Sequence, residues 1–239
     1  MKTIFTDDYD PKKVIKEADE YIYVKGGDGT LLRAIHKFSH LNKPFFGVAG
    51  GSLNFLMNNT KGTKPAKKHT IKIFRRIKVT VYYKKRERDL SSIYDVLKPK
   101  KGVFQAFNDV CIGGSDGMDA WINFEIEEKD KLFGEFKGGG LIISTPQGST
   151  GINKTNRGTI LPLSSNLWSI TGDKTNHNID YVIKPRKTII KPTSRNSVMV
   201  WIDGSNTVLD NVEKVVIEQG DKIELIFNDY DEFKKKRRR

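Results

Sequence analysis

With 239 residues, 37% of them hydrophobic and 30% charged, the chain has the length and composition of a globular protein with one large domain or two smaller ones. No apolar run approaches the ~20 residues that a membrane-spanning helix needs, and the acidic residues that follow Phe5 do not fit a signal peptide. Because Cys111 is the single cysteine, the chain cannot form an intrachain disulfide, and we expect a reducing, cytoplasmic location.

The formal net charge of +13 is distributed unevenly. Residues 234–239 are all Lys or Arg, and residues 61–88 hold twelve Lys or Arg against a single Glu. Nucleic-acid binding is one interpretation of this charge. A basic surface that attracts a polyanionic small molecule is favoured over it, because no nucleic-acid-binding module is recognisable.

The first sixty residues are predicted to alternate between strands and helices. Strands are expected over 3–5, 21–24 and 44–48, and helices over 11–18 and 29–38. A βαβαβ order of this kind favours a parallel sheet, with the ligand at the carboxyl ends of its strands. Residues 60–65 are interpreted as a linker.

After the linker, the pattern changes to short runs typical of strands, separated by Gly, Asn, Asp or Pro. These runs are 71–73, 77–83, 103–112, 120–127, 141–144, 181–183, 197–202, 214–218 and 223–227, and one short helix is expected over 89–97. We therefore predict an α/β plus all-β protein. Its doubly wound α/β domain spans 1–65 and its mainly antiparallel β-sandwich domain spans 66–227, while 228–239 either return to the first domain or are disordered.

The segment Gly26-Gly27-Asp28-Gly29-Thr30 stands between a predicted strand and a predicted helix. Strand, glycine turn and helix N-terminus together form a geometry that holds phosphate, because backbone N–H groups converge where no Cβ blocks the approach. A carboxylate inside such a turn is repelled by phosphate unless it has a task, so Asp28 is a candidate general base. An ordinary tight turn is an equally good interpretation of the motif taken alone.

Three further segments carry polar or glycine-rich patterns. Residues 47–56 end a strand in a second glycine turn, and Asn108-Asp109 interrupts a strand-like run with two polar residues that also commonly start turns. Residues 137–151 place three consecutive glycines before an apolar strand and a loop rich in hydroxyl groups after it. Such a loop offers many small donors and acceptors to a polar ligand, although a simple Ser/Thr turn remains possible.

Taken together and in this order, the four segments resemble the NAD kinase family, whose members phosphorylate the 2′-hydroxyl of the adenosine ribose of NAD with ATP or polyphosphate. The likeness runs from about Tyr21 to Phe227. Gly-Gly-Asp-Gly-Thr by itself also suits diacylglycerol, sphingosine and phosphofructo kinases. The loop 144–150, which reads Ser-Thr-Pro-Gln-Gly-Ser-Thr, selects the NAD kinases.

The resemblance implies that Asp28 is the catalytic base and that the neighbouring turn holds the phosphates of the donor. The residues implied in binding are Gly26, Gly27, Gly29, Thr30, Arg33, Asn108, Asp109, Lys137, Ser144, Ser149, Thr150, Gly151, Ile152, Asn153 and Thr155. It also implies NAD and ATP as substrates, Mg²⁺ carried by the ATP, and a homodimer or homotetramer. No metal site built by the protein itself is required.

The chain departs from the family pattern at three places. The resemblance implies an aspartate at Gly139 and an aromatic ring at Ile152, and a His-Pro dipeptide is reduced to Leu161-Pro162. Asp203-Gly204 stands where the family has a similar pair, but we interpret it as a hairpin turn. These departures leave two alternatives open: a kinase for another acceptor, such as a lipid or a nucleoside, and an NAD-binding homologue with impaired catalysis.

Overall fold

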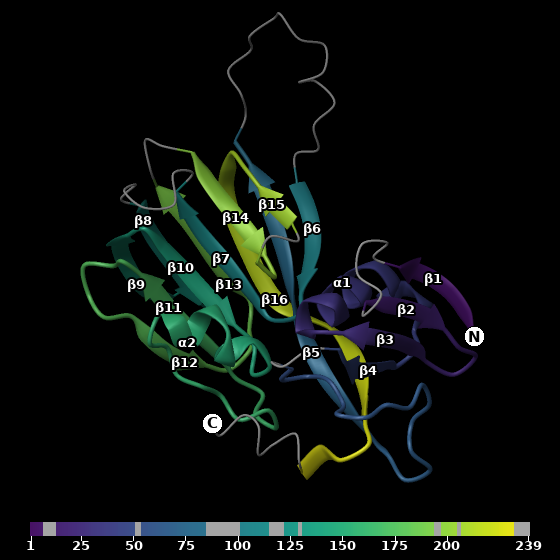
Figure 1. The fold of residues 1–239 in the computed structure, drawn as a ribbon. Coiled ribbons are helices and arrows are strands. Elements are labelled where there is room, and N and C mark those ends of the chain that lie inside the picture. The colour runs from purple at the N-terminus through teal and green to yellow at the C-terminus, as the bar shows by residue number, and fades with distance from the viewer. Residues whose placement is uncertain are drawn as a thin grey trace, which may run out of the picture. The chain divides into compact units, whose positions relative to one another are not determined.

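The computed structural model describes residues 1–6, 13–50, 54–84, 101–114, 122–128, 131–193, 197–204 and 207–231. Contacts between residues divide the chain into two compact units: unit 1 consists of residues 1–75 and 222–239, and unit 2 of residues 76–221 (Figure 1). The chain passes between them inside two long strands, β5 (Thr70–Tyr83) and β16 (Val212–Phe227). The domain boundaries predicted after residues 65 and 227 stay a prediction.

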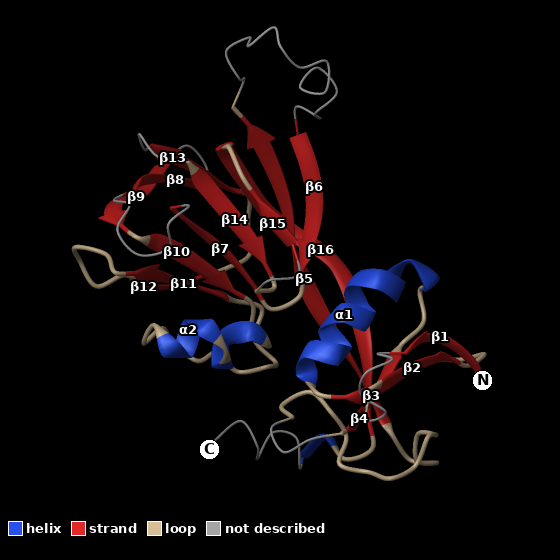
Figure 2. Ribbon diagram, turned by 45° about the horizontal axis from the view of Figure 1, so that its top comes forward, coloured by secondary structure: helices blue, strands red, loops and turns tan. Residues whose placement is uncertain are grey.

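Unit 1 is an α/β unit in which one helix connects two parallel strands. Strand β3 (Ile22–Gly26) pairs in parallel with β4 (Phe45–Ala49), and helix α1 (Asp28–Phe38) with the short η1 (Ser39–Leu41) connects them (Figure 2). Residues 22–24 are consecutive and buried, which is typical of a strand covered on both faces. Asn58 ties this sheet to β16, since its Nδ2 donates to the carbonyls of Gly47 and Ile226.

Helix α1 follows from the spacing of its apolar residues. Leu31, Ala34, Ile35 and Phe38 recur at intervals of three and four residues, and all four are buried. His36 and Lys37 occupy the last turn, where positive charge interacts favourably with the helix dipole. The helix therefore begins directly after Gly27, which places Asp28 in its first turn.

The helix predicted over 11–18 is wrong in its described part. Residues Val14–Glu17 form strand β2, which pairs antiparallel with β1 (Lys2–Thr6) and with β3; residues 11 and 12 lie outside the described ranges. Ile15 is only 1% exposed in this strand. The β-branched pair Val14-Ile15 favours a strand, and pairing on both sides satisfies its backbone groups, which outweighs a weak helical pattern.

Unit 2 consists of antiparallel strands in two sheets. The first sheet runs in the order β12 (Asp180–Ile183), β11 (Trp168–Asp173), β10 (Gly140–Ser144), β7 (Asp109–Gly114), β14 (Val198–Ile202) and β15 (Thr207–Leu209). The second contains β6 (Lys101–Ala106), β8 (Ile122–Glu128), β9 (Lys131–Gly138) and β13 (Thr188–Thr193) with parts of β5 and β16. Two short helical turns, η3 (Gly148–Thr150) and α2 (Ile152–Thr155), follow β10.

One apolar core joins the two sheets of unit 2. Side chains of one sheet, such as Ile143 and Trp168, share a buried cluster with Phe124 and Ile190 of the other. This confirms the predicted fold class, an α/β part followed by an antiparallel β-sandwich. The strand predicted over 103–112 is corrected to two strands, β6 and β7, which belong to different sheets and are separated by a bend at Phe107 and Asn108. The helix predicted over 89–97 lies outside the described residues.

Candidate active site

In unit 1, the Gly26–Thr30 segment connects β3 to α1. Gly26 has a φ of +153°, and a Cβ built there would meet the Thr30 Oγ1 at 2.6 Å, so this position requires glycine. The Gly27 carbonyl accepts the N–H groups of Thr30 and Leu31, which closes the first turn of α1. A Cβ on Gly29 would meet nothing within 4 Å. The exposed backbone of Gly29 at a helix N-terminus therefore leaves room for an anion.

Asp28 connects the two glycine-rich segments of unit 1. Its Oδ2 accepts the N–H of Phe55 at 2.7 Å, and its Oδ1 accepts the N–H of Leu56 at 2.8 Å. The second glycine-rich segment, residues 47–56, therefore ends in the two N–H groups that bind the Asp28 carboxylate. Residues 51–53 of this segment lie outside the described part. A carboxylate oxygen carries two lone pairs, so an oxygen that accepts one N–H can also accept a bond from a hydroxyl.

Thr30 and Arg33 are neighbours one turn apart on α1. Thr30 is buried, and its Oγ1 accepts a long hydrogen bond of 3.4 Å from the exposed guanidinium of Arg33. The Thr30 side chain therefore stabilises the turn from inside the protein. Arg33 is the cation of this turn that can reach an anion in solvent.

In unit 2, the loop 145–151 is anchored to the bend between β6 and β7. The Thr145 hydroxyl lies within hydrogen-bond distance of the carbonyl oxygens of Phe107 (2.8 Å) and Asn108 (2.9 Å), and the Gln147 amide donates to Phe107 at 2.6 Å. A Cβ on Gly148 would lie 2.1 Å from the Asn108 carbonyl oxygen. Two segments that are separate in the sequence, Asn108-Asp109 and 144–151, are therefore brought together, and glycine is required where they touch.

Two residues implied in binding are used by the protein itself. Ser149 is buried, donates to the Pro146 carbonyl and accepts the N–H of Leu161. The Asn153 amide donates to two carbonyls and accepts the hydroxyls of Ser169 and Thr171. These two side chains therefore hold the shape of the loop.

The predicted binding residues of this region that face solvent are Thr150, Gly151, Ile152, Thr155 and, on β9, Lys137. Thr150 is half-buried, while the other four are exposed, Ile152 at 42%. An aliphatic side chain with that exposure offers an apolar contact to a ligand ring. Ile152 and Thr155 of α2 therefore lie on the solvent-facing side of this short helix.

Polar atoms without partners gather at the adjoining ends of β7 and β10. Among the described residues, the Asn108 Oδ1 and the Ser144 Oγ are buried and have no hydrogen-bond partner. Asp109 is the cross-strand neighbour of Ser144 and is 6% exposed; burial, followed by the negative charge of Asp203, raises the pKa of its carboxyl to about 7. Buried polar groups are normally satisfied, so these atoms make this place a candidate for binding a polar ligand.

Asp203 is a further residue of this region, which its sequence pattern assigned only to a turn. The turn is confirmed between β14 and β15. Its side chain is 4% exposed, and its carboxylate accepts the N–H groups of Phe107 (2.7 Å), Asn108 (2.6 Å) and Asp109 (3.1 Å). Asp203 therefore fixes the backbone that carries Asn108 and Asp109. The signal in the sequence was an Asp-Gly pair at the place where the family has a similar one.

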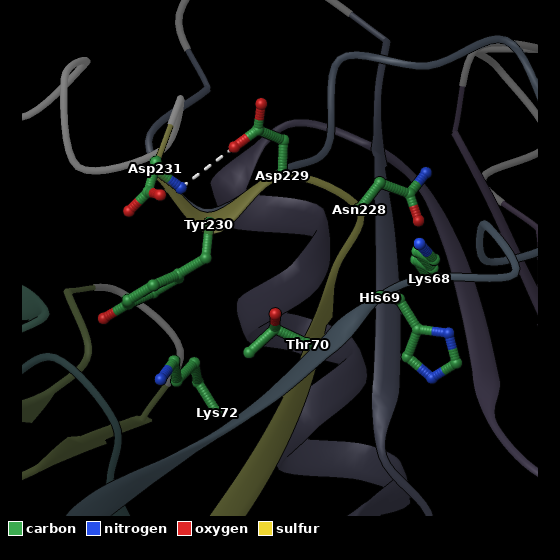
Figure 3. Close-up of a pocket in the computed structure, with 8 residues that line it drawn as sticks. All are labelled: Lys68, His69, Thr70, Lys72, Asn228, Asp229, Tyr230 and Asp231. Atoms are coloured by element: carbon green, nitrogen blue, oxygen red, sulfur yellow. Dashed lines mark hydrogen bonds between the residues drawn. The ribbon is translucent and has the colours of Figure 1, made fainter.

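A separate hollow of about 520 Å³ lies in unit 1. Figure 3 shows that its lining side chains come from two segments, 68–72 and 228–231. The Lys72 ammonium lies 4.5 Å from the centre of the Tyr230 ring, a cation–π contact. None of the site residues predicted from the sequence lines this hollow.

Sequence comparisons relate the chain to NAD kinases. The NAD kinase of Rickettsia africae (strain ESF-5) is 36% identical over 160 residues, which are 66% of this chain and 57% of that protein. The NAD kinase of Rickettsia typhi is 32% identical over 158 residues, 65% of this chain and 56% of that protein. The matched region thus spans less than two thirds of these relatives. No protein-family model matches the chain.

Comparisons of structure relate the fold to that of two such kinases. An NAD kinase from Archaeoglobus fulgidus, solved in complex with ATP, matches 90% of this chain and 80% of its own with a TM-score of 0.67 and 17% identity. Yeast NADH kinase complexed with NADH matches 92% of this chain and 65% of its own with a TM-score of 0.73 and 16% identity. The fold is therefore the fold of these kinases, and the resemblance to the NAD kinase family found in the sequence is confirmed.

Proposed function

We propose that this chain, whose sequence resembles the NAD kinases and whose fold matches theirs, is itself an NAD kinase that makes NADP from NAD and ATP. The observation that carries the proposal is Asp28 in the first turn of a helix that begins with a glycine turn, in a chain related to these enzymes. Unit 1 has a glycine turn with a carboxylate, and unit 2 has buried polar atoms without partners at Asn108 and Ser144.

In the proposed reaction, the 2′-hydroxyl of the adenosine ribose of NAD attacks the γ-phosphorus of ATP. The new bond joins the ribose oxygen to phosphorus, the bond to the β–γ bridging oxygen breaks, and ADP leaves. The hydroxyl proton passes to the Asp28 carboxylate. The backbone N–H groups near Gly27 and Gly29, with Arg33, hold the phosphates of the donor, which enters as its Mg²⁺ complex, and Thr30 supports their turn from inside the protein.

Unit 2 binds the dinucleotide in this proposal. Asn108 Oδ1, Asp109 and Ser144 Oγ gain partners from the ligand. The half-buried Thr150 and the exposed Gly151, Ile152, Thr155 and Lys137 complete the contacts. Gly26, Ser149 and Asn153 contribute by holding the backbone in place. Asp203 orients the Asn108-Asp109 pair.

The experiment is a coupled assay for NADP with the wild-type chain and with Asp28→Asn. We expect the variant to lose at least a hundredfold in kcat, because a general base typically contributes 10²–10⁴-fold, while the Kd for NAD stays within about twofold. Asp19→Asn, an equal loss of charge at an exposed residue of unit 1, serves as the control and should keep full activity. Comparable turnover by Asp28→Asn would remove Asp28 from this role.

The same assay distinguishes the substrates. Replacing ATP by polyphosphate identifies the donor, and replacing NAD by NADH, a lipid alcohol or a nucleoside identifies the acceptor. A chain that binds NAD but forms no NADP with either donor would be an NAD-binding homologue without catalysis, and this result would contradict the proposal.

A homodimer or homotetramer in the cytoplasm is the assembly and location that we propose. Described residues contain no helix long and apolar enough to cross a membrane. Free Cys111 is the chain's single cysteine and suits a reducing compartment. Light scattering of the purified chain measures the assembly.

A further inference from the structure

Strand β12 forms one edge of the first sheet of unit 2. It stands at the end of the strand order of that sheet, and among the described strands it pairs with β11 alone (Figure 1). A strand at the edge of a sheet presents backbone N–H and C=O groups to which a further strand can add. A second chain can therefore extend the sheet at β12.

The two faces of β12 have different environments. Ile183 is buried in the core of unit 2, and Tyr181, on the same face, has its ring centre 6.0 Å from that of an aromatic ring of β9. Asp180, Val182 and Lys184 alternate with these two residues and therefore belong to the outer face of the sheet. Val182 is 43% exposed, and the two charged side chains are exposed as well. An aliphatic side chain between two opposite charges thus lies along this edge.

The residues on either side of β12 limit the length of chain that can pair at this edge. Pro185 has no N–H group, so a ladder of backbone hydrogen bonds ends before it. At the other end, the carbonyl of the buried Ile179 already accepts the N–H of Gly172 at 3.1 Å. Residues 180–184 therefore remain for pairing, and Val182 is the centre of this segment.

The segment 180–184 is complementary to itself when two copies run antiparallel. With a two-fold axis at Val182, Asp180 lies opposite the partner subunit's Lys184, and Tyr181 lies opposite the partner subunit's Ile183. Each of these pairs occurs twice, and the two Val182 side chains meet at the axis. Opposite charges directly across a strand pair stabilise it, as do pairs of aromatic and β-branched residues. Two-fold symmetry of this kind, in which a surface meets its own copy, is the symmetry of a homodimer.

We propose that two copies of this chain associate through β12, so that the first sheet of unit 2 continues from one chain into the other. The inference rests on the proposed homodimeric assembly, and it is independent of the phosphoryl transfer at Asp28. One edge of five residues forms a small contact, and small interfaces are typically weak, so we expect a dimer Kd on the order of micromolar.

The test is sedimentation velocity of the full chain over a range of concentrations that spans this Kd. We expect Lys184→Glu to raise the dimer Kd at least about tenfold, because both symmetric charge pairs become repulsive. Asp180→Lys makes the same two pairs repulsive from the other side and should have the same effect. Lys187→Glu is an equal change of charge at an exposed residue beyond Pro185, and it should leave the Kd within about twofold of wild type.

Asp180 has a second role, which the test takes into account. Its carboxylate accepts the N–H of Thr159 at 2.9 Å and the Thr159 hydroxyl at 2.7 Å. Thermal unfolding therefore checks the folding of every variant. Lys184→Glu leaves these two hydrogen bonds in place, so it decides the outcome if Asp180→Lys folds poorly.

A mixture of the two variants tests the register of the pairing. Asp180→Lys carries two cations along the edge and Lys184→Glu carries two anions, so each variant repels its own copy. One chain of each kind restores both opposite-charge pairs, and we expect this heterodimer to have a Kd within about threefold of the wild-type Kd. Lys187→Glu is the control partner for Asp180→Lys, because one of the two pairs then stays repulsive and the heterodimer should be weaker. A local defect in either variant would not be repaired by mixing.

The outcomes separate the surface, the assembly and the reaction. Wild-type dimers that persist unchanged in Lys184→Glu, or a mixture that stays monomeric, overturn β12 as the contact surface and leave the homodimer standing. A wild-type chain that is monomeric at every concentration overturns the homodimer and this surface together. NADP formation by the same samples is measured in parallel, and its failure overturns the proposed reaction without changing the result for β12.

Discussion

At the scale of single residues, carboxylates with similar chemistry have different environments. Asp28 accepts two backbone N–H groups at a helix start, Asp203 accepts three, and Asp109 is buried without comparable donors among the described residues. Donors stabilise the charged form, whereas burial destabilises it. In the sequence these three residues are simply aspartates. The environment of each one decides whether it can position backbone, take a proton or recognise a ligand.

The raised pKa of Asp109 makes stability depend on pH. In the unfolded chain this carboxyl ionises near 3.8, while in the folded chain it ionises at about 7, so the folded state holds its proton more tightly. The contribution of Asp109 to stability is therefore present below about pH 4 and is lost as the pH rises towards 7. At 1.36 kcal/mol per pH unit, the full loss is on the order of 4 kcal/mol.

Asp109→Asn removes this titration. Relative to wild type, we expect the variant to gain stability between pH 4 and pH 7, as measured by urea unfolding at both values. Asp210→Asn makes the same substitution at an exposed residue and serves as the control, with a stability close to that of wild type at both pH values. A constant difference for Asp109→Asn would show that the carboxyl is ionised normally in the folded protein.

At the scale of elements, the two glycine-containing loops differ in what they tolerate. Gly148 closes the loop 145–151 against the Asn108 carbonyl, whereas Gly29 lies open in the first turn of α1. We expect Gly148→Ala to lower the free energy of unfolding by about 1–3 kcal/mol, because the added methyl group displaces backbone. Gly29→Ala should not destabilise the chain, since alanine favours helix by up to about 1 kcal/mol.

Chemical denaturation of the two variants measures this contrast. The activity assay adds a second readout, because Gly29→Ala places a methyl group where phosphate is proposed to approach and should raise the KM for ATP. Equal stability of Gly148→Ala and wild type would mean that the loop can move away from the bend at Asn108.

At the scale of the whole molecule, the excess of positive charge is expected to act on binding at long range. Residues 61–75 contain six Lys or Arg and one His, no acidic residue, and the side chains of Lys64, Lys67 and Lys68 are exposed. Raising ionic strength shortens the screening length from ~10 Å at 0.1 M to ~3 Å at 1 M. We therefore expect the KM for ATP to rise several-fold with salt while kcat changes little.

A variant with Lys64, Lys67 and Lys68 all replaced by Gln should show a smaller salt dependence of the KM for ATP. Replacing Lys184, Lys187 and Lys214 of unit 2 by Gln makes an equal change of charge elsewhere and serves as the control. An identical dependence in both variants would mean that overall charge, and not the 61–75 segment, attracts the donor.

The sequence by itself determined the local features of this protein. The turn around Asp28, helix α1 and the hydroxyl-rich loop after β10 were predictable because each depends on neighbouring residues: glycine at a backbone position that excludes Cβ, and apolar side chains at helical spacing. The order of these segments was also sufficient to indicate the kinase family.

Only the tertiary structure decided the features that join distant residues. Strand β2 replaces a predicted helix because strands on both sides complete its hydrogen bonds, and the run 103–112 divides between two sheets. Strand pairing brings Asp203 to the Asn108-Asp109 backbone, although Asp203 and Asp109 are 94 positions apart along the chain. It also brings Asp173 close to Gly139, 34 positions away. Such contacts depend on sheet register, which local sequence patterns do not encode, and so they became visible only in the folded chain.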